Sequence, residues 1–169
     1  IISNIESILI QNGYSMIICD YRESEKLEHE KTEFLLSKMV DGIITMPSSS
    51  NGEHIKRVLE KNIPVVLLDR PIKDVNCDVV LVDNLNASYN AVEQLIIRGH
   101  KRIGIICGSK EIYTAQERLK GYLRVHEDYS MEIDPQLIKY GDYQIDGGYK
   151  LMNELLDMES RPTAIFVTN

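Results

Sequence analysis

Short apolar runs and amphipathic segments alternate along this chain of 169 residues. The apolar runs do not alternate with polar residues, which is typical of parallel strands buried on both faces. The amphipathic segments repeat apolar residues every three or four positions, which indicates helices with one buried face. Strands that alternate with helices predict an α/β fold with parallel sheets.

The apolar runs predict strands over 15–19, 43–46, 63–68, 79–82, 103–107, 137–140 and 164–167. The amphipathic segments predict helices over 1–12, 25–39, 55–62, 85–96, 115–126 and 145–156. The gap before the strand 79–82 is too short for a crossover helix, so we expect a loop there and a strand near a sheet edge. The second helix is expected to bury Leu27, Phe34, Leu35 and Met39, and the last helix is marked by Ile145, Tyr149, Met152 and Leu156.

The segment Arg98–Ser109 shows one full cycle of this pattern. Gly99 follows a helical pattern and can adopt the left-handed conformation that ends a helix. The basic residues 100–102 add donors and positive charge where helix carbonyls lack partners. The apolar run 103–107 then stops at Gly108, at the strand end that faces the ligand crevice in an open α/β sheet.

Composition narrows the classes of function. A net charge of −7 and a pI near 5.1 argue against a nucleic-acid surface, which needs clustered Lys and Arg. The three cysteines lack metal-ligand spacing, and Cys19 and Cys107 are expected to be buried free thiols, as suits a reducing cytosol. No apolar run approaches the length of a membrane span.

Both ends of the chain fall inside predicted elements. The first residue is Ile1, within an amphipathic pattern, and no signal-peptide pattern is present. The last residues, Thr168 and Asn169, directly follow an apolar strand. We therefore expect the chain to be a fragment of a longer protein.

Polar or flexible residues follow most predicted strands. Right-handed crossovers place these strand ends on one side of a sheet, where their carboxylate, amide and guanidinium groups suit a hydroxyl-rich ligand. The residues at these ends are Asp20, Thr45-Met46, Asp69-Arg70, Gly108-Ser109 and Asn169.

Signatures of enzymes are scarce. The Gly-x-Gly-x-x-Gly, P-loop and Gly-x-Ser-x-Gly patterns do not occur. The four histidines lie in different predicted helices or caps, where surface or capping roles are expected, so the sequence predicts no metal site and no cofactor. An enzyme is poorly supported.

Several motifs occur in a fixed order along the whole chain. They are Val40–Ile44, Ile63–Arg70, Val82–Asn84, Leu95–Gly104, Arg118–Tyr122, Gly141–Tyr143 and Arg161–Phe166. Each motif alone is loose, but the ordered series is specific. The sequence resembles the effector-binding core of the LacI/GalR family of bacterial transcription regulators.

The resemblance implies a type I periplasmic-binding-protein-like fold with two Rossmann-like lobes and a ligand in the cleft between them. Residues 1–83 would form the first lobe, without its first strand, and residues 84–169 part of the second lobe. The family's N-terminal helix-turn-helix domain is absent from this chain, and a homodimer in the cytoplasm, away from membranes, is expected.

The resemblance also implies site residues. Arg118 matches the arginine that clamps the family's ligands, although without the motif a surface arginine would be favoured. Asp69 matches a strand-end aspartate that approaches the ligand in several relatives, but a salt bridge to Arg70 or a turn cap is about as plausible. Tyr143 matches an aromatic residue beside the ligand, and its alternative is a packed loop residue.

Four further residues complete the predicted site. Asn169 matches a polar residue that hydrogen-bonds the ligand. Asp20 stands where many members have asparagine, which leaves its role open. Thr114 and Met46 could line the cleft.

The sequence therefore predicts a regulator core that binds a small metabolite, a sugar or sugar derivative, and controls operator DNA through a domain outside these residues. The alternative from another class is a periplasmic sugar-binding protein of an ABC transporter. An upstream helix-turn-helix or an upstream signal sequence would distinguish the two.

Overall fold

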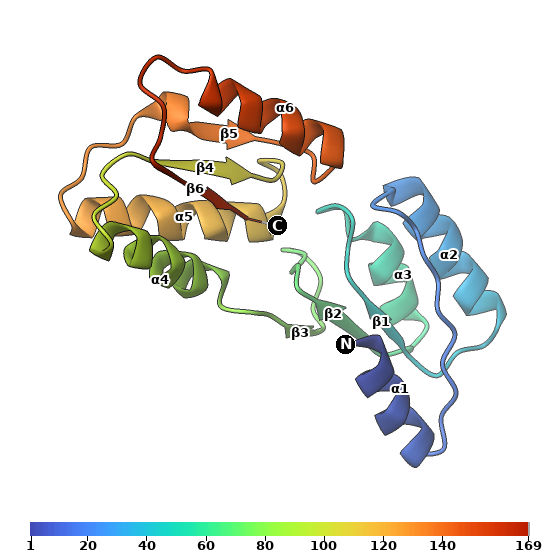
Figure 1. The fold of residues 1–169 in the computed structure, drawn as a ribbon. Helices are drawn as coiled ribbons and strands as arrows, with labels where there is room; N and C mark the ends of the chain where they lie inside the picture. Colours follow the sequence, from blue (N-terminus) through green and yellow to red (C-terminus); the bar gives the residue numbers. More distant parts are fainter. Residues whose placement is uncertain (169) are drawn as a thin grey trace. The chain divides into compact units, whose positions relative to one another are not determined.

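The computed structural model describes residues 1–168, which form helices and parallel strands joined by short loops (Figure 1). The chain divides into two compact units, Ile1–Asp41 and the residues from Gly42 onward. The predicted α/β class with parallel sheets is confirmed.

The first unit holds α1 (Ile2–Gln11) and α2 (Glu25–Ser37). The prediction that α2 buries Phe34 and Met39 is wrong, because their exposed fractions are 43% and 87%. Met39 lies beyond the end of α2 with a φ of 54°, and Phe34 lies under the ammonium group of Lys38 at the helix surface.

The predicted strand over 15–19 is also wrong. These residues have no regular secondary structure, and the side chains of Ile17 and Ile18 are exposed. A strand forms only when its backbone groups pair with a neighbour, and residues 1–41 contain no other strand.

The second unit contains a first sheet in the order β1-β2-β3, all parallel. The strands are β1 (Ile43–Thr45), β2 (Val65–Leu68) and β3 (Asp78–Val80). The helix α3 (Glu53–Glu60) packs on β2 with its buried residues Ile55 and Val58. A loop joins β2 to β3, and β3 lies at the sheet edge, as predicted.

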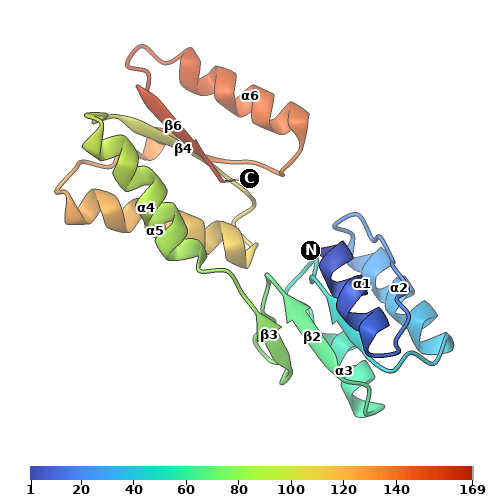
Figure 2. The same cartoon turned by 60° about the horizontal axis from the view of Figure 1, so that its bottom comes forward.

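The second sheet has the order β5-β4-β6, again parallel. Its strands are β4 (Ile103–Cys107), β5 (Ile138–Tyr140, after a 3₁₀ turn at Pro135–Leu137) and β6 (Ala164–Val167). The helices α4 (Asn84–Ile97) and α5 (Tyr113–Asp128) cover one face, and α6 (Ile145–Leu156) covers the other (Figures 1 and 2).

Every residue of β4 is buried, which confirms the interpretation of the run 103–107. Side chains alternate across a strand, so the two faces of β4 belong to two apolar clusters. One cluster joins Ile103, Ile105 and Cys107 to Val92, Tyr122 and Val125 of α4 and α5, and the other joins Ile106 to Leu137 and Leu155.

The two helices α4 and α5 approach closely at Gly121. A Cβ at this position would lie 2.9 Å from Ser88 Cβ and 2.9 Å from the backbone nitrogen of Tyr89. Only a residue without a side chain fits between the helices here, which explains the glycine in the Arg118–Tyr122 motif.

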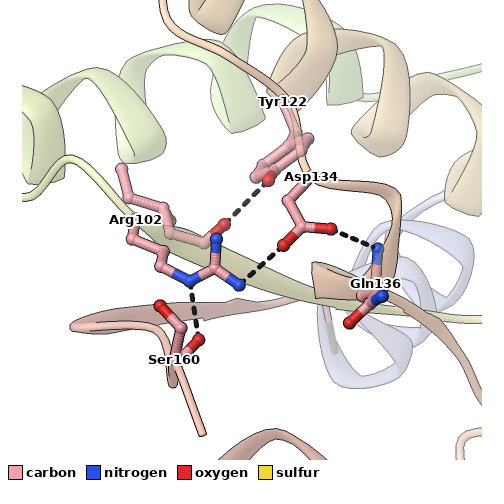
Figure 3. Close-up of polar contacts among 6 residues, drawn as sticks. Arg102, Tyr122, Asp134, Gln136 and Ser160 are labelled. Carbon is pink, nitrogen blue, oxygen red and sulfur yellow. Dashed lines mark hydrogen bonds and ion pairs between the residues drawn. The ribbon is translucent and has the colours of Figure 1, made fainter. Parts of the chain in front are cut away.

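The end of α4 follows the prediction only in part. Gly99 has a φ of 92°, as expected of a left-handed cap, and the backbone N–H of His100 donates to Leu95. The Arg102 side chain does not cap α4. Its guanidinium donates to Asp134 at 2.6 Å and to the Ser160 carbonyl at 2.7 Å (Figure 3).

The predicted helix over 145–156 is confirmed as α6; the four residues that mark it, Ile145, Tyr149, Met152 and Leu156, are exposed, and its buried residue is Leu155. Two further expectations need correction. His54 and His126 are buried rather than at the surface. Cys107 is a buried free thiol as expected, whereas Cys19 is only half-buried.

Candidate functional site

The three strands of the second sheet end at one edge. The register pairs Cys107 with Tyr140 and Ile106 with Val167, so the residues that follow the strands are neighbours. We define the carboxyl-edge site by four residues at this edge, Gly108, Arg118, Tyr143 and Thr168. Its location agrees with the crevice that open α/β sheets use for ligands.

Arg118 lies on α5, half-buried, and two hydrogen bonds fix its guanidinium. Its Nε donates to Asn84 Oδ1 at 2.7 Å, and its Nη1 donates to the Thr168 carbonyl at 2.5 Å. These bonds occupy two of the five N–H groups of a guanidinium. The arginine is therefore oriented by α4 and by the end of β6, with donors remaining for another partner.

Tyr143 lies two residues after Gly141, which follows β5, and its φ of 62° is in the left-handed region. Its ring covers Gly108 at the end of β4 so closely that a Cβ on Gly108 would overlap the ring. Its phenol oxygen is buried and has no hydrogen-bond partner among the described residues. The ring is thus packed against the end of β4, as the alternative of a packed loop residue expects, while its hydroxyl is left without a partner among the described residues.

Thr168 directly follows β6, and its backbone N–H continues the ladder to Ile106 at 3.1 Å. Its Oγ1 is a second buried hydroxyl oxygen for which residues 1–168 supply no partner. Thr114, also buried, lies on α5 one turn before Arg118. The predicted residue Asn169 follows Thr168 and lies outside the described residues.

The first sheet has its own carboxyl edge, where Met46 follows β1 and Asp69 follows β2. Asp69 has a φ of 62°, and its backbone N–H donates to Val80 at 2.8 Å. The neighbouring Arg70 donates from its Nη1 to the Pro47 carbonyl at 3.0 Å. Met46 is partly exposed, at 36%.

Asp20 belongs to the first unit, unlike the other predicted site residues. It accepts a hydrogen bond from the backbone N–H of Arg22 at 2.9 Å, and its carboxylate lies 3.8 Å from the Arg22 guanidinium. Both contacts are local and exposed, so they define a turn.

The sequence interpretation missed two residues of this region, Thr168 and Asn84. Thr168 was passed over for its neighbour Asn169, although the end of the apolar run at Val167 marks both. Asn84 had a signal in the Val82–Asn84 motif, but its contact with Arg118 joins residues 34 positions apart, which no local pattern reveals.

A cavity of about 750 Å³ lies at the other end of the second sheet, beside Ile103 at the start of β4. Its lining includes Tyr122, His126 and the Arg102–Asp134 pair drawn in Figure 3, but none of the predicted site residues. Burial lowers the pKa of His126, whose Nδ1 lies 2.8 Å from the Tyr122 carbonyl.

Within residues 1–168, no group of three or more His, Cys, Asp or Glu side chains could hold a metal ion. No helix in this part of the chain has both the length and the apolar character needed to cross a membrane.

The whole chain, residues 1–169, matches the family described as periplasmic binding proteins and the sugar-binding domain of the LacI family. It is 32% identical over 167 residues to the HTH-type transcriptional repressor PurR of Actinobacillus pleuropneumoniae, covering 98% of this chain and 49% of the repressor. The chain thus spans about half the length of the curated relatives it matches.

Solved structures of transcription regulators are similar to this chain as well. The transcription regulator CcpA of Lactococcus lactis is similar with a TM-score of 0.87 and 29% identity, over 98% of this chain and 60% of that structure. The transcriptional regulator CelR in complex with cellobiose is similar with a TM-score of 0.87 and 27% identity, over 98% of this chain and 51% of that structure. These similarities confirm the predicted periplasmic-binding-protein-like fold.

Proposed function

Since the chain belongs to the family of periplasmic binding proteins and LacI-family sugar-binding domains, we propose that it is the effector-binding core of a LacI-type transcriptional regulator. A small sugar-like effector binds at the carboxyl-edge site and changes operator binding by a helix-turn-helix domain outside these residues. The similarity to the PurR repressor supports this reading.

One observation supports the location above others. The buried hydroxyl oxygens of Tyr143 and Thr168 lack partners among the described residues, and the backbone carbonyl of Thr168 accepts a hydrogen bond from the guanidinium of Arg118. An unpaired buried polar group costs about 1–3 kcal/mol. A sugar hydroxyl both donates and accepts, so it can satisfy either protein hydroxyl and also accept from the arginine.

The roles of the other residues follow from the same chemistry. The Tyr143 ring offers an aromatic face to the apolar side of a sugar ring. Asp69 and Met46, at the carboxyl edge of the first sheet, are proposed to contact the effector from the lobe 1–83, and Thr114 from the lobe 84–169. Asp20 and Asn169 remain proposed effector contacts.

The effector regulates DNA binding only through a difference in its affinity for two lobe arrangements. That CelR was solved with cellobiose supports a small carbohydrate as the ligand class. In this proposal the regulator core catalyses no reaction. Its similarity to transcriptional regulators supports this part of the proposal.

Calorimetry on the natural protein with a panel of D-glucose, D-ribose, cellobiose and fructose 1-phosphate tests the proposal. A charge-assisted hydrogen bond contributes about 1.5–3 kcal/mol, so Arg118→Ala should weaken binding of the tightest sugar about 10- to 150-fold. Arg124→Ala is the matched control on the same helix, with its side chain 60% exposed. Equal affinities of the wild type and Arg118→Ala would remove Arg118 from the site.

The alternative remains a periplasmic sugar-binding protein, a class that the family also contains. The similarity to transcriptional repressors favours the regulator. The regulator reading also proposes a cytoplasmic location, where the three free cysteines stay reduced. The gene sequence upstream of the Ile1 codon distinguishes the two: a helix-turn-helix domain there supports the regulator, and a signal sequence supports the periplasmic binding protein.

The regulator is further proposed to be a homodimer. The exposed apolar side chains of α6 support this, because they follow helical spacing on one face: Ile145, Tyr149, Met152 and Leu156. Contiguous exposed apolar surface is typical of protein interfaces. Sedimentation velocity should find a dimer in the natural protein and a monomer after Ile145→Asp with Tyr149→Asp, and an unchanged sedimentation coefficient would place the dimer contact elsewhere.

A further inference from the structure

The side chain of Asn84 joins the proposed effector arginine to the segment that precedes α4. Asn84 is the first residue of α4 and is only 4% exposed. Its Oδ1 accepts from Arg118 Nε at 2.7 Å, and its Nδ2 donates to the Val82 carbonyl at 3.1 Å. Its backbone N–H donates to the same carbonyl at 2.8 Å.

We propose that Asn84 is a positioning residue of the carboxyl-edge site, which orients Arg118 and ties its guanidinium to the Val82–Asp83 segment. This inference rests on the proposed function, in which Arg118 binds the effector. Asn84 itself need not touch the effector.

The two hydrogen-bond partners of the Asn84 side-chain amide determine its orientation. Arg118 Nε can only donate and the Val82 carbonyl can only accept, so a flipped amide would lose both bonds. The orientation of Asn84 is therefore determined by its neighbours. An amide also satisfies Nε without a negative charge, so the guanidinium keeps its full charge for an effector.

Packing places the two residues together. The approach of α4 and α5 at Gly121 sets the distance between the first turn of α4 and the arginine on α5. Asp83 caps α4 by accepting from the backbone N–H of Asn86 at 3.1 Å, which fixes where the helix starts. The close approach of the helices at Gly121 and the Asp83 cap therefore both hold the Asn84 amide near Arg118.

The position of Val82 gives the contact a regulatory consequence. Residues 81–83 connect β3, which ends at Val80, to α4. A guanidinium that shifts to meet an effector must either carry Asn84 and the Val82 carbonyl with it or break the 2.7 Å bond. Effector binding at Arg118 is thereby coupled to the segment that leaves the first sheet.

The first test needs no effector. In the ¹⁵N-labelled natural protein, the Nε–H resonance of Arg118 should exchange slowly with solvent, and Asn84→Ala should speed its exchange at least tenfold. Asn90→Ala, at an exposed position of the same helix, is the control and should leave the rate unchanged. An exchange rate that Asn84→Ala does not alter would overturn the inference.

A second variant covers the case in which Asn84→Ala does not fold. Asn84→Asp keeps the acceptor for Nε and loses the donor to Val82. It should preserve slow exchange of the Arg118 Nε–H. Exchange as fast as that of Arg124 in this variant would overturn the inference.

The second test separates positioning from general stability. With the tightest sugar of the calorimetric panel, Asn84→Ala should weaken binding roughly tenfold. If Asn84 acts through Arg118, the double variant Asn84→Ala/Arg118→Ala binds no more weakly than Arg118→Ala alone. Additive losses would overturn the inference. Failure of Arg118→Ala itself to weaken binding would instead contradict the proposed function and leave the exchange result to stand by itself.

Discussion

Replacement of Gly121 by alanine tests the close approach of α4 and α5. An alanine Cβ would lie 2.9 Å from Ser88 Cβ and from the Tyr89 nitrogen, and closer still to the Leu85 carbonyl oxygen. Two of these three atoms belong to the backbone, so the helices must separate. Overpacking costs about 1–3 kcal/mol, whereas alanine gains about 1 kcal/mol of helix propensity over glycine. Because backbone must shift, we expect a net loss of about 1–2 kcal/mol.

Gly148 offers the matched control. It also lies inside a helix, α6, but an added Cβ would meet no atom within 4 Å. Gly148→Ala should therefore stabilise the protein by about 0.5–1 kcal/mol through backbone entropy alone.

Thermal unfolding followed by circular dichroism at 222 nm measures the difference. In a chain of this size 1 kcal/mol shifts Tm by about 2–4 °C. Gly121→Ala should lower Tm by about 2–8 °C, and Gly148→Ala should raise it by about 1–4 °C. Shifts of the same sign and size would refute the packing argument.

Two other predictions concern the two ends of the second sheet. Gly108→Ala should displace the Tyr143 ring and weaken sugar binding about 10-fold or more in calorimetry. The reason is that a stacked ring contributes about 0.5–1.5 kcal/mol to binding and its hydroxyl about 1 kcal/mol. An unchanged affinity would contradict the role of Tyr143. Burial lowers the pKa of His126 below its ordinary value of 6.5, so the stability it contributes is present above that pH and is lost as the pH falls further. Melts at pH 7.5 and pH 5.5 should show a drop in Tm that His126→Gln reduces, and an equal drop in this variant would assign the acid sensitivity to other groups.

The sequence pattern predicted the elements where local signals and pairing agree. The run 103–107 lacks alternation because both of its faces are covered, and Gly99 adopts the positive φ that its position suggests. The run 15–19 has the same apolar character but no partner strand, so it stays irregular. Hydrophobicity reports a tendency to be buried, whereas a strand also requires a neighbour.

The face of a helix was harder to predict than its existence. α6 has apolar residues around much of its circumference, and the periodic residues that mark the helix, such as Ile145 and Tyr149, do not include its buried residue, Leu155. The choice between two apolar faces depends on which one meets the sheet, and that information is not local in the sequence.

In the candidate site, too, some features could be predicted from local sequence patterns and others depend on contacts between distant residues. Asp69 could be named from the sequence because it follows a predicted strand and strand ends share an edge, whereas Tyr143 was implied only by the resemblance to a family. Contacts between distant elements could not, as the Asn84–Arg118 bond and the burial of the Thr168 hydroxyl demonstrate. The resemblance to a family identified Arg118, but only the packing of α4 on α5 explains how its guanidinium is held.

A crystal structure of the natural protein with its tightest-binding sugar tests the central claim most directly. We predict sugar oxygens within hydrogen-bond distance of the Arg118 guanidinium and of at least one of the two buried hydroxyls, Tyr143 and Thr168. A sugar bound instead in the cavity beside Tyr122 and His126, with both hydroxyls still unpaired, would contradict the account.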